Sequence, residues 1–313
     1  MASVASAAAE PGHELVVSGG RRGFWRAVTA NRKVTLGLIV VFFFTLLAIF
    51  GPFFVGSNVN AFGLDRSAPP SGAHLLGTTA YGQDVLAQVV VGARASVALG
   101  FSTGVIATII AVIVGLVSGY VGGWLDEVLS VFSNVFLVLP ALPLAIVLAS
   151  FIPYKGPLII GFVLIITGWS WGARVLRAQT LSIRNREFVT AAKSTGEPTS
   201  RIIFYEILPG MIAVVVAQLL GTIIYAILAE AGLEYLGLGD LRGVSWGTML
   251  YWAGNQDALA LGYWWWFVPP GLCIAVLGAA LAFVNFGVDE IANPRLRTVK
   301  AEKRRTRGKA KEA

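Results

Sequence analysis

Apolar and polar residues follow one another along this chain in long blocks. Six apolar runs of about 20 residues each are long enough to cross a lipid bilayer. In lipid the backbone polar groups must bond within the segment, so each run is predicted to be a helix. The sequence therefore predicts an all-α, polytopic membrane protein with six transmembrane helices. The predicted spans are 34–55, 97–120, 128–152, 158–176, 211–235 and 264–288.

Prolines, tryptophans and one polar segment refine these predictions. Kinks are expected at Pro140 and Pro143 in the third span and at Pro269 and Pro270 in the sixth. Residues 84–91 are expected to form an amphipathic helix at the membrane interface before the second span begins. The cluster Trp264, Trp265 and Trp266 is typical of an aromatic belt at the bilayer surface.

Composition agrees with a membrane protein and argues against an enzyme. The chain is 56% hydrophobic and only 13% charged, which is extreme for a soluble domain. It has one cysteine, Cys273, inside an apolar run, and two histidines, His13 and His74, in different segments. His74 is interpreted as structural, because no second metal ligand lies near it in the sequence. No phosphate-binding loop for ATP occurs, so we expect no cofactor in this chain.

The net charge of +7 gives the expected orientation. Basic residues gather before the first span, between the fourth and fifth spans, and in the nine Lys and Arg residues from Arg295 to Lys311. The positive-inside rule then places both termini and the 187–209 segment in the cytosol. Three parts are expected: a cytosolic tail at 1–33, a transmembrane domain at 34–293, and a basic tail at 294–313. Beside a membrane, the basic tails favour contact with lipid headgroups over nucleic acid. The first run follows 33 polar or mixed residues and is interpreted as an anchor, not a cleaved signal.

The segment 187–209 carries the most specific pattern. It is predicted to form a short helix over 187–195, to stop at 196–198, and to continue as a second amphipathic stretch. Gly196 can adopt the left-handed conformation that ends a helix, and Pro198 cannot continue it. The small pair Ala191 and Ala192 lets another surface approach closely, which suggests a docking helix.

This pattern resembles the coupling loop of ABC-importer permeases: Glu-Ala-Ala, three residues, Gly, nine residues, Ile, one residue, Leu-Pro. The matching residues here are Thr190, Ala191, Ala192, Gly196, Leu208 and Pro209. The family's Glu is replaced by Thr190 and its Ile by Glu206. The resemblance implies that these residues, with Glu187, couple the chain to an ATPase subunit.

Three further stretches resemble the dipeptide, oligopeptide and nickel class of these permeases. The first spans His74 to Ser96 and keeps most of the family's residues, with Thr79, Gln83 and Gln88 as replacements. The second runs from Gly119 to Asp126, after which Val131 and Asn134 stand where the family has an arginine and a second aspartate. The third lies at 226–250. Within the second span, Gly115 and Gly119 have a spacing that allows close helix packing.

The resemblance implies a type I ABC-importer permease fold and four kinds of partner. These are a second homologous permease, two cytosolic ATPases that bind ATP and Mg²⁺, an extracytoplasmic substrate-binding protein, and the lipid of a bacterial or archaeal plasma membrane. A secondary transporter or channel not driven by ATP is the alternative, and an intramembrane enzyme is a third class. The former should show charged relays within the spans or a pair of discontinuous helices, and the spans here are nearly free of charge. The latter needs a cluster of catalytic side chains within the spans, and none is evident.

A polar stripe on the fifth span is the candidate translocation surface. Gln218, Thr222, Tyr225 and Glu230 are spaced by three to five residues, which places them near one helical face. They either line a wet pathway or hold helices together by hydrogen bonds. Asn134 is added because it replaces a charged family residue. The substrate stays open between peptides, oligosaccharides and metal chelates: 134–146 and 285–297 look more similar to branches associated with oligosaccharides.

Overall fold

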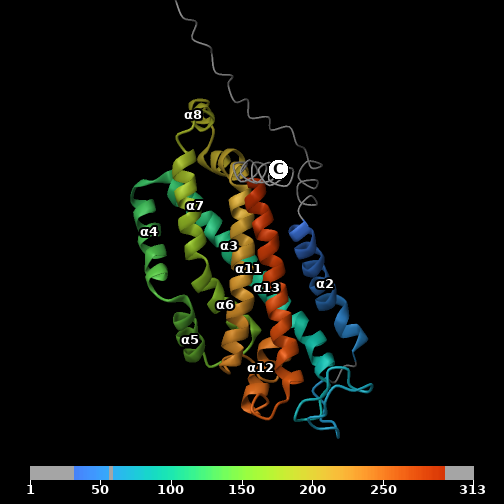
Figure 1. The fold of residues 1–313 in the computed structure, drawn as a ribbon. Helices are drawn as coiled ribbons and strands as arrows, with labels where there is room; N and C mark the ends of the chain where they lie inside the picture. Colours follow the sequence, from blue (N-terminus) through green and yellow to red (C-terminus); the bar gives the residue numbers. More distant parts are fainter. Residues whose placement is uncertain (1–31, 56–58, 293–313) are drawn as a thin grey trace, which may run out of the picture.

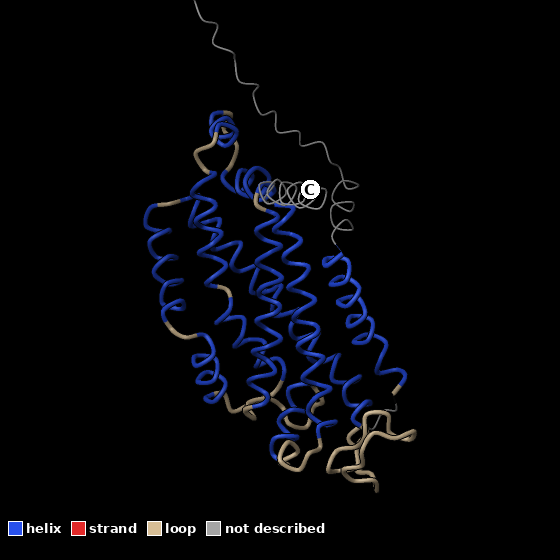
Figure 2. Tube along the Cα trace, in the orientation of Figure 1, coloured by secondary structure: helices blue, strands red, loops and turns tan. Residues whose placement is uncertain are grey.

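The computed structural model describes residues 32–55 and 59–292, and the predicted tails fall almost wholly outside this part. The described residues form a bundle of helices (Figures 1 and 2). Their bounds are α2 Arg32–Phe54, α3 Val85–Val121, α4 Gly123–Val138, α5 Ala141–Phe151, α6 Pro157–Gly168, α7 Ser170–Ile183, α8 Glu187–Ser194, α9 Thr199–Arg201, the π-helix η1 Ile202–Ile207, α10 Leu208–Gly210, α11 Ile212–Tyr235, α12 Trp246–Asn255 and α13 Trp264–Ala292.

The two ends of the bundle hold different elements (Figure 1). One end carries α8, together with the first turns of α2 and the last turns of α13; we call it the α8 end. The opposite end carries α12 and the loop 59–84, and we call it the α12 end. The α8 end thus holds both the beginning and the end of the long described helices, as expected if the chain crosses the membrane an even number of times.

In the part of the chain that the structure describes, five helices are long and apolar enough to cross a membrane: α2, α3, the joined pair α6–α7, α11 and α13. The predicted third span is not a straight helix. It consists of α4 and α5, which are bent by 89° at a break before Ala141. Pro140 has no backbone N–H to donate, so the kink predicted there becomes a full break. Counted as one span, this pair brings the total to six.

Helix α3 corrects the prediction of a separate interfacial helix at 84–91. Those residues form the first turns of one continuous 37-residue helix, whose N-cap Asp84 accepts a hydrogen bond from the backbone N–H of Ala87. At 1.5 Å per residue α3 is about 55 Å long, well beyond the bilayer core. Val85 and Val89 are buried in the protein core and do not lie on lipid. The amphipathic pattern of 84–91 reflects packing against other helices of the protein. A helix with one buried face has the same spacing of apolar residues whether that face meets protein or a membrane surface.

Glycines bring α3 close to two neighbours. A Cβ added at Gly100 or Gly104 would lie within 2.5 Å of Ile227 or Ile223 on α11. A Cβ at Gly115 would lie 2.7 Å from the carbonyl oxygen of Ala173 on α7. The close packing predicted from the Gly115 and Gly119 spacing is confirmed, and α7 is the partner helix.

The tryptophan cluster at the start of α13 is only partly an interfacial belt. Trp264 is exposed, whereas Trp265 and Trp266 are buried in the core. Successive helical residues point about 100° apart, so three in a row cannot all face lipid. The Trp265 indole N–H donates to the backbone oxygen of Thr78, and α13 continues through Pro269 and Pro270.

Candidate functional site

Helix α8 stands at one end of the bundle and is attached by one buried side chain. Val189 is fully buried and belongs to an apolar cluster that includes Leu176 of α7 and Ile202 of η1. Ala192 is half-buried against the same cluster, while Ala191 is exposed. The two alanines therefore differ: Ala192 seats the helix on its own chain, and Ala191 is free to meet a partner.

The C-terminal end of α8 has the conformation that its sequence predicts. The backbone N–H of Glu197 donates to the carbonyl oxygen of Ala192 at 3.2 Å, and Gly196 adopts φ +78°. This is the 6→1 hydrogen bond of a left-handed C-terminal cap. No heavy atom lies within 4 Å of a Cβ built at Gly196, so backbone strain alone requires glycine there. The predicted helix and its stop are confirmed.

Polar contacts tie α8 and its surroundings to the core helices. The Lys193 ammonium lies 4.9 Å from the ring centroid of Tyr120, near the end of α3. The Arg184 guanidinium donates to the carbonyl oxygen of Gly119 at 3.2 Å. Each contact links the segment after α7 with the last turns of α3. Glu187, in the first turn of α8, is exposed and complements the positive end of the helix dipole.

The second half of the segment is a π-helix. In η1 the residues Ile202, Ile203 and Ile207 are buried, whereas Phe204, Tyr205 and Glu206 are exposed. Leu208 is half-buried and Pro209 exposed in the short α10. Together with Phe188 on α8, which is 44% exposed, Phe204 and Tyr205 leave aromatic surface uncovered at the α8 end. Exposed aromatic side chains gathered in this way are a candidate surface for contact with another molecule.

An ion pair near the α8 end was missed by sequence reasoning. The Arg177 guanidinium on α7 makes two hydrogen bonds, of 2.6 and 2.8 Å, with the two carboxylate oxygens of Asp126 on α4. Ser130 donates a third to the same carboxylate. The sequence did contain a signal for this pair, because Asp126 and Arg177 carry opposite charges at the ends of neighbouring apolar runs. The pair fastens α4 to α7 and leaves Asp126 with a partner even though Val131 and Asn134 carry no charge.

The polar stripe on α11 faces α6 and α7 of its own chain. The Gln218 side-chain amide donates to Thr222 Oγ1 at 3.1 Å and packs against Gly172 of α7. The Tyr225 hydroxyl lies 3.4 Å from Thr167 Oγ1 of α6. These three residues thus lie together, as the spacing predicted. The contact between Tyr225 and Thr167 joins two helices, as the packing alternative predicted, whereas Gln218 and Thr222 bond to each other within α11.

The other two pathway candidates lie apart from this stripe. Glu230 is nearer the α12 end, is 1% exposed and accepts a hydrogen bond from Ser96. Asn134 lies on α4 and is exposed, and its side chain makes no hydrogen bond within the described residues. The structure therefore does not bring the five candidates into one surface of this chain.

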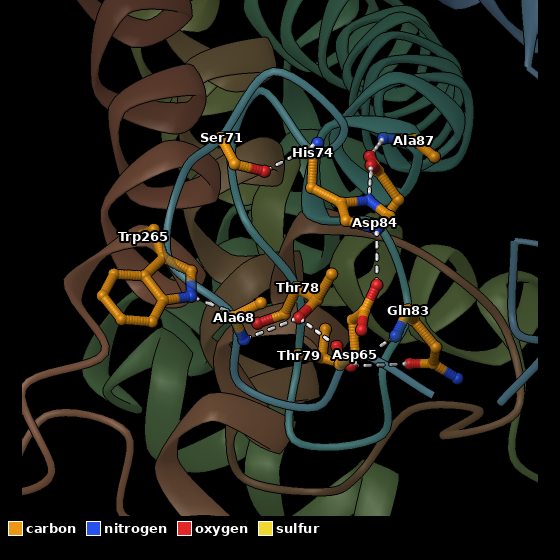
Figure 3. A network of polar contacts seen from close by, with 10 residues as sticks. All are labelled: Asp65, Ala68, Ser71, His74, Thr78, Thr79, Gln83, Asp84, Ala87 and Trp265. Atoms are coloured by element: carbon orange, nitrogen blue, oxygen red, sulfur yellow. Dashed lines mark hydrogen bonds and ion pairs between the residues drawn. The ribbon is translucent and has the colours of Figure 1, made fainter. Parts of the chain in front are cut away.

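The loop 59–84 at the α12 end is held by a network of side chains (Figure 3). His74 Nδ1 lies 2.8 Å from Asp84 Oδ2, and its Nε2 lies 3.9 Å from Asp65 Oδ2. Thr78 Oγ1 accepts from the N–H of Ala68 and donates to the carbonyl oxygen of Asp65. His74 is thus a structural link between the loop and the N-cap of α3, as its sequence context suggested.

Comparison with known proteins gives the class of protein. Residues 111–298 match the family described as binding-protein-dependent transport system inner membrane component, which is more than half of the chain. Residues 21–70 match the N-terminal transmembrane domain of oligopeptide transport permease C. The chain belongs to this family of membrane permeases, and the helical, multi-pass fold agrees with it.

Its similarity to individual permeases extends over most of its length. It is 35% identical over 275 residues to the oligopeptide transport system permease protein OppC of Bacillus subtilis, covering 86% of this chain and 87% of that one. It is 34% identical over 276 residues to the dipeptide transport system permease protein DppC of the same organism, covering 87% and 85%. The OppC protein of Lactococcus lactis subsp. lactis is 31% identical over 270 residues, covering 84% and 90%.

Proposed function

We propose that this chain is a permease subunit of an ATP-driven ABC importer, and that α8 couples it to an ATPase subunit. The observation that carries the proposal is α8 itself: an exposed helix with a small-residue patch, seated on the core through Val189 and ended by Gly196. A second homologous permease would complete the pathway. Two ATPases would bind ATP and Mg²⁺, and an extracytoplasmic binding protein would deliver the substrate. Closure of the ATPases would push α8 and η1 as one body.

Charge supports the orientation in this proposal. Lys193, Arg184, Arg186 and Arg201 lie at the α8 end, which the positive-inside rule assigns to the cytosol. The chain would then lie in a bacterial or archaeal plasma membrane with both termini cytosolic. Cysteine labelling of intact cells in a Cys273→Ala background tests this. Leu64→Cys, at a fully exposed position, should be labelled from outside and Lys193→Cys should not; the reverse pattern contradicts the orientation.

The coupling role is tested with two matched pairs of variants in the purified complex. Gly196→Val should reduce ATPase retention or substrate-stimulated hydrolysis, because a β-branched residue resists φ +78° at a cost of about 1–2 kcal/mol. Gly262→Val is its control, since Gly262 has φ +76° and equally open surroundings at the α12 end. Ala191→Trp should block docking and Ala191→Ser should not. Ala192 is a less suitable position for this substitution, because its side chain packs partly against the core of its own chain.

Normal coupling in both Gly196→Val and Ala191→Trp would mean that α8 is not the transmission element. Loss of coupling in Gly262→Val as well would mean that any strained loop produces the effect. Membership of a family of binding-protein-dependent transporters already argues against the alternative of a secondary transporter or channel.

For the substrate, we propose oligopeptides or a similar small oligomeric solute. The names of the relatives, oligopeptide and dipeptide permeases, support peptides. The sequence resemblance at 134–146 and the uncharged Thr79, Gln83 and Gln88 keep oligosaccharides as an alternative. Calorimetry of the cognate binding protein with di- to pentapeptides and with β-linked oligosaccharides decides between them. Binding of oligosaccharides alone would overturn the peptide proposal.

We also propose that the stripe and Asn134 contribute to the translocation pathway in the assembled importer. Asn134 is exposed on α4, and Gln218 and Tyr225 are only half-buried, so a second permease can complete a polar surface with them. Asn134→Trp and Gln218→Trp should block uptake while the complex still assembles. If assembly falls in proportion to uptake, these residues serve packing alone.

A further inference from the structure

A cavity lies at the α12 end, in the part of the chain that the structure describes. Its volume is about 400 Å³, which is in the range of sites that hold small ligands. Its wall is built by segments that are distant in sequence: the loop 59–84, the start of α3, the stretch 241–252 and the start of α13. None of the coupling residues at the α8 end and none of the stripe on α11 belongs to this wall.

Hydrogen bonds between these segments hold the wall in place. The Asn60 side-chain amide donates to the carbonyl oxygen of Arg242 at 3.1 Å, which joins the loop 59–84 to the loop before α12. The Gln83 amide donates to the carbonyl oxygen of Asn60 at 2.9 Å, and the Gln88 amide donates to Gln83 Oε1 at 2.9 Å. Both glutamines stand where this stretch departs from the permease pattern. The shape of the cavity is therefore fixed by contacts within this chain.

Aromatic side chains give the lining an apolar character. Phe62 meets Tyr81 edge to face with ring centroids 5.7 Å apart, and Tyr81 meets Trp252 in the same way at 5.9 Å. Trp266 and Met249 add further apolar surface. Phe62 is 75% exposed, so its ring has apolar area that a ligand could cover. A ligand for this cavity therefore needs an apolar body.

Two polar groups of the lining lack partners. The Trp266 indole N–H is buried and has no hydrogen-bond partner in this part of the chain. Gln88 is 6% exposed, and its Oε1 accepts no hydrogen bond from the described residues. A buried donor left unpaired is costly, and such groups in native proteins call for an explanation. One free donor and one free acceptor are the complement of a peptide unit, which carries one of each.

Charge and hydrogen-bonding capacity narrow the class of ligand. Arg242 is the one charged residue of the lining, is exposed, and forms no ion pair within the described residues. It would repel a cationic group. A saccharide carries a hydroxyl on almost every carbon, and most of these would stay unpaired against aromatic rings and against amides already bonded to the wall. The lining thus suits an apolar amino-acid residue with its peptide groups better than a sugar or a lysine side chain.

We propose that this cavity is a subsite for one apolar residue of a small peptide, separate from the stripe on α11. The apolar side chain lies against Phe62 and Trp252. The ligand's carbonyl oxygen accepts from the Trp266 indole, and its N–H donates to Gln88 Oε1. The assignment of this face to the outside of the membrane rests on the function proposed above. In that orientation a peptide meets this subsite before it enters the spans.

Calorimetry tests the proposal with the full-length chain, purified with its associated subunits in lipid nanodiscs, without ATP and without the binding protein. The probe is the tripeptide Ala-Phe-Ala, compared with Ala-Ala-Ala, Ala-Lys-Ala and cellobiose. Ala-Phe-Ala should bind about tenfold more tightly than each of the others, because it combines an uncharged ring with free peptide groups. Equal binding of Ala-Lys-Ala or cellobiose would overturn the proposed class of ligand.

Variants show where the probe binds. Phe62→Ala should weaken binding of Ala-Phe-Ala about three- to tenfold, whereas Leu64→Ala, at a fully exposed position in the same loop, should not. Trp266→Phe should weaken binding about tenfold, although no hydrogen bond is lost in the unbound protein. Trp265→Phe is its matched control. The Trp265 N–H bonds to Thr78, so this variant should lower the unfolding temperature and leave binding unchanged.

Other outcomes place the peptide elsewhere. Unchanged binding in Phe62→Ala or in Trp266→Phe, or loss of binding in Gln218→Trp on the α11 stripe, would overturn the proposal. Binding that appears only after the binding protein is added would also overturn it, because the cavity would then serve that protein. Neither ATP nor α8 enters the measurement. A failure of the proposed coupling role therefore leaves the expected result unchanged, and the two proposals can fail separately.

Discussion

The two ends of this bundle are built by different physical means. At the α12 end, fully buried Trp246 and the hydrogen-bonded loop 59–84 fix the structure within one chain. At the α8 end, an eight-residue helix has one fully buried residue, Val189, with Ala192 half-buried beside it, and its other residues are exposed. The difference teaches that the α12 end is held by contacts within this chain, whereas α8 leaves most of its surface uncovered, as the coupling role proposed for it requires. A rigid core and a lightly attached helix are what transmission of a push requires.

The largest expected effect lies at the α12 end. Trp246→Ala should destabilise the isolated chain by about 3–5 kcal/mol, the range for a buried aromatic residue. Its indole N–H donates to the carbonyl oxygen of Val89, and its ring meets Phe44 edge to face at 5.5 Å. Thermal unfolding in detergent measures the change. Trp124→Ala is the control, since Trp124 is 74% exposed and should have little effect.

The next effect should be confined to the α8 end. Val189→Ala removes most of the buried side chain that seats α8, which is worth at most about 1.5–3 kcal/mol. Hydrogen exchange should become faster in α8, while the temperature of global unfolding changes little. Exposed Thr190→Ala should leave exchange unchanged. A fall in global stability equal to the local effect would show that α8 unfolds only together with the core.

A smaller effect is expected in the loop 59–84. Thr78→Val keeps the shape of the side chain but removes its hydrogen bonds to Ala68 and Asp65, at about 1–3 kcal/mol for buried groups left unpaired. The loop should become sensitive to protease, while the spans stay folded. Thr199→Val, at an exposed position at the α8 end, serves as the control. Unchanged protection would mean that His74 and Trp265 suffice to hold the loop.

The smallest effect concerns the contact between Lys193 and Tyr120. Lys193→Met keeps the length of the side chain but removes its charge, and should cost about 0.5–1 kcal/mol. A double-mutant cycle with Tyr120→Leu, read by hydrogen exchange in α8, isolates this term. A coupling energy near zero would leave Val189 as the main attachment of α8.

Most of the fold could be predicted from local sequence. The spans at 34–55, 211–235 and 264–288 correspond to α2, α11 and α13, because length and apolarity alone decide such helices. The end of α8 at Gly196 could likewise be predicted from neighbouring residues alone. The break at Pro140 was predicted only as a kink, since its 89° angle depends on what α4 and α5 pack against.

The candidate site was less accessible to sequence reasoning. The order of Thr190, Ala191 and Ala192 was readable, but not that Ala192 turns toward the core while Ala191 faces out. Glu234 and Asp126 were visible as residues, yet their partners Ser245 and Arg177 come from other helices. The structure buries Ser245 at the N-cap of α12, which no local pattern indicated.

By itself the sequence determined the membrane class, the approximate spans, the family resemblance and the end of the exposed helix. These depend on apolar length, backbone conformation and residue order, which are properties of contiguous segments. Only the tertiary structure decided that 84–91 belongs to α3, that two of the three tryptophans are buried, and that Glu230 and Glu234 are both buried. Burial depends on which neighbour covers a residue. That neighbour is set by packing between helices distant in sequence, which no local pattern contains.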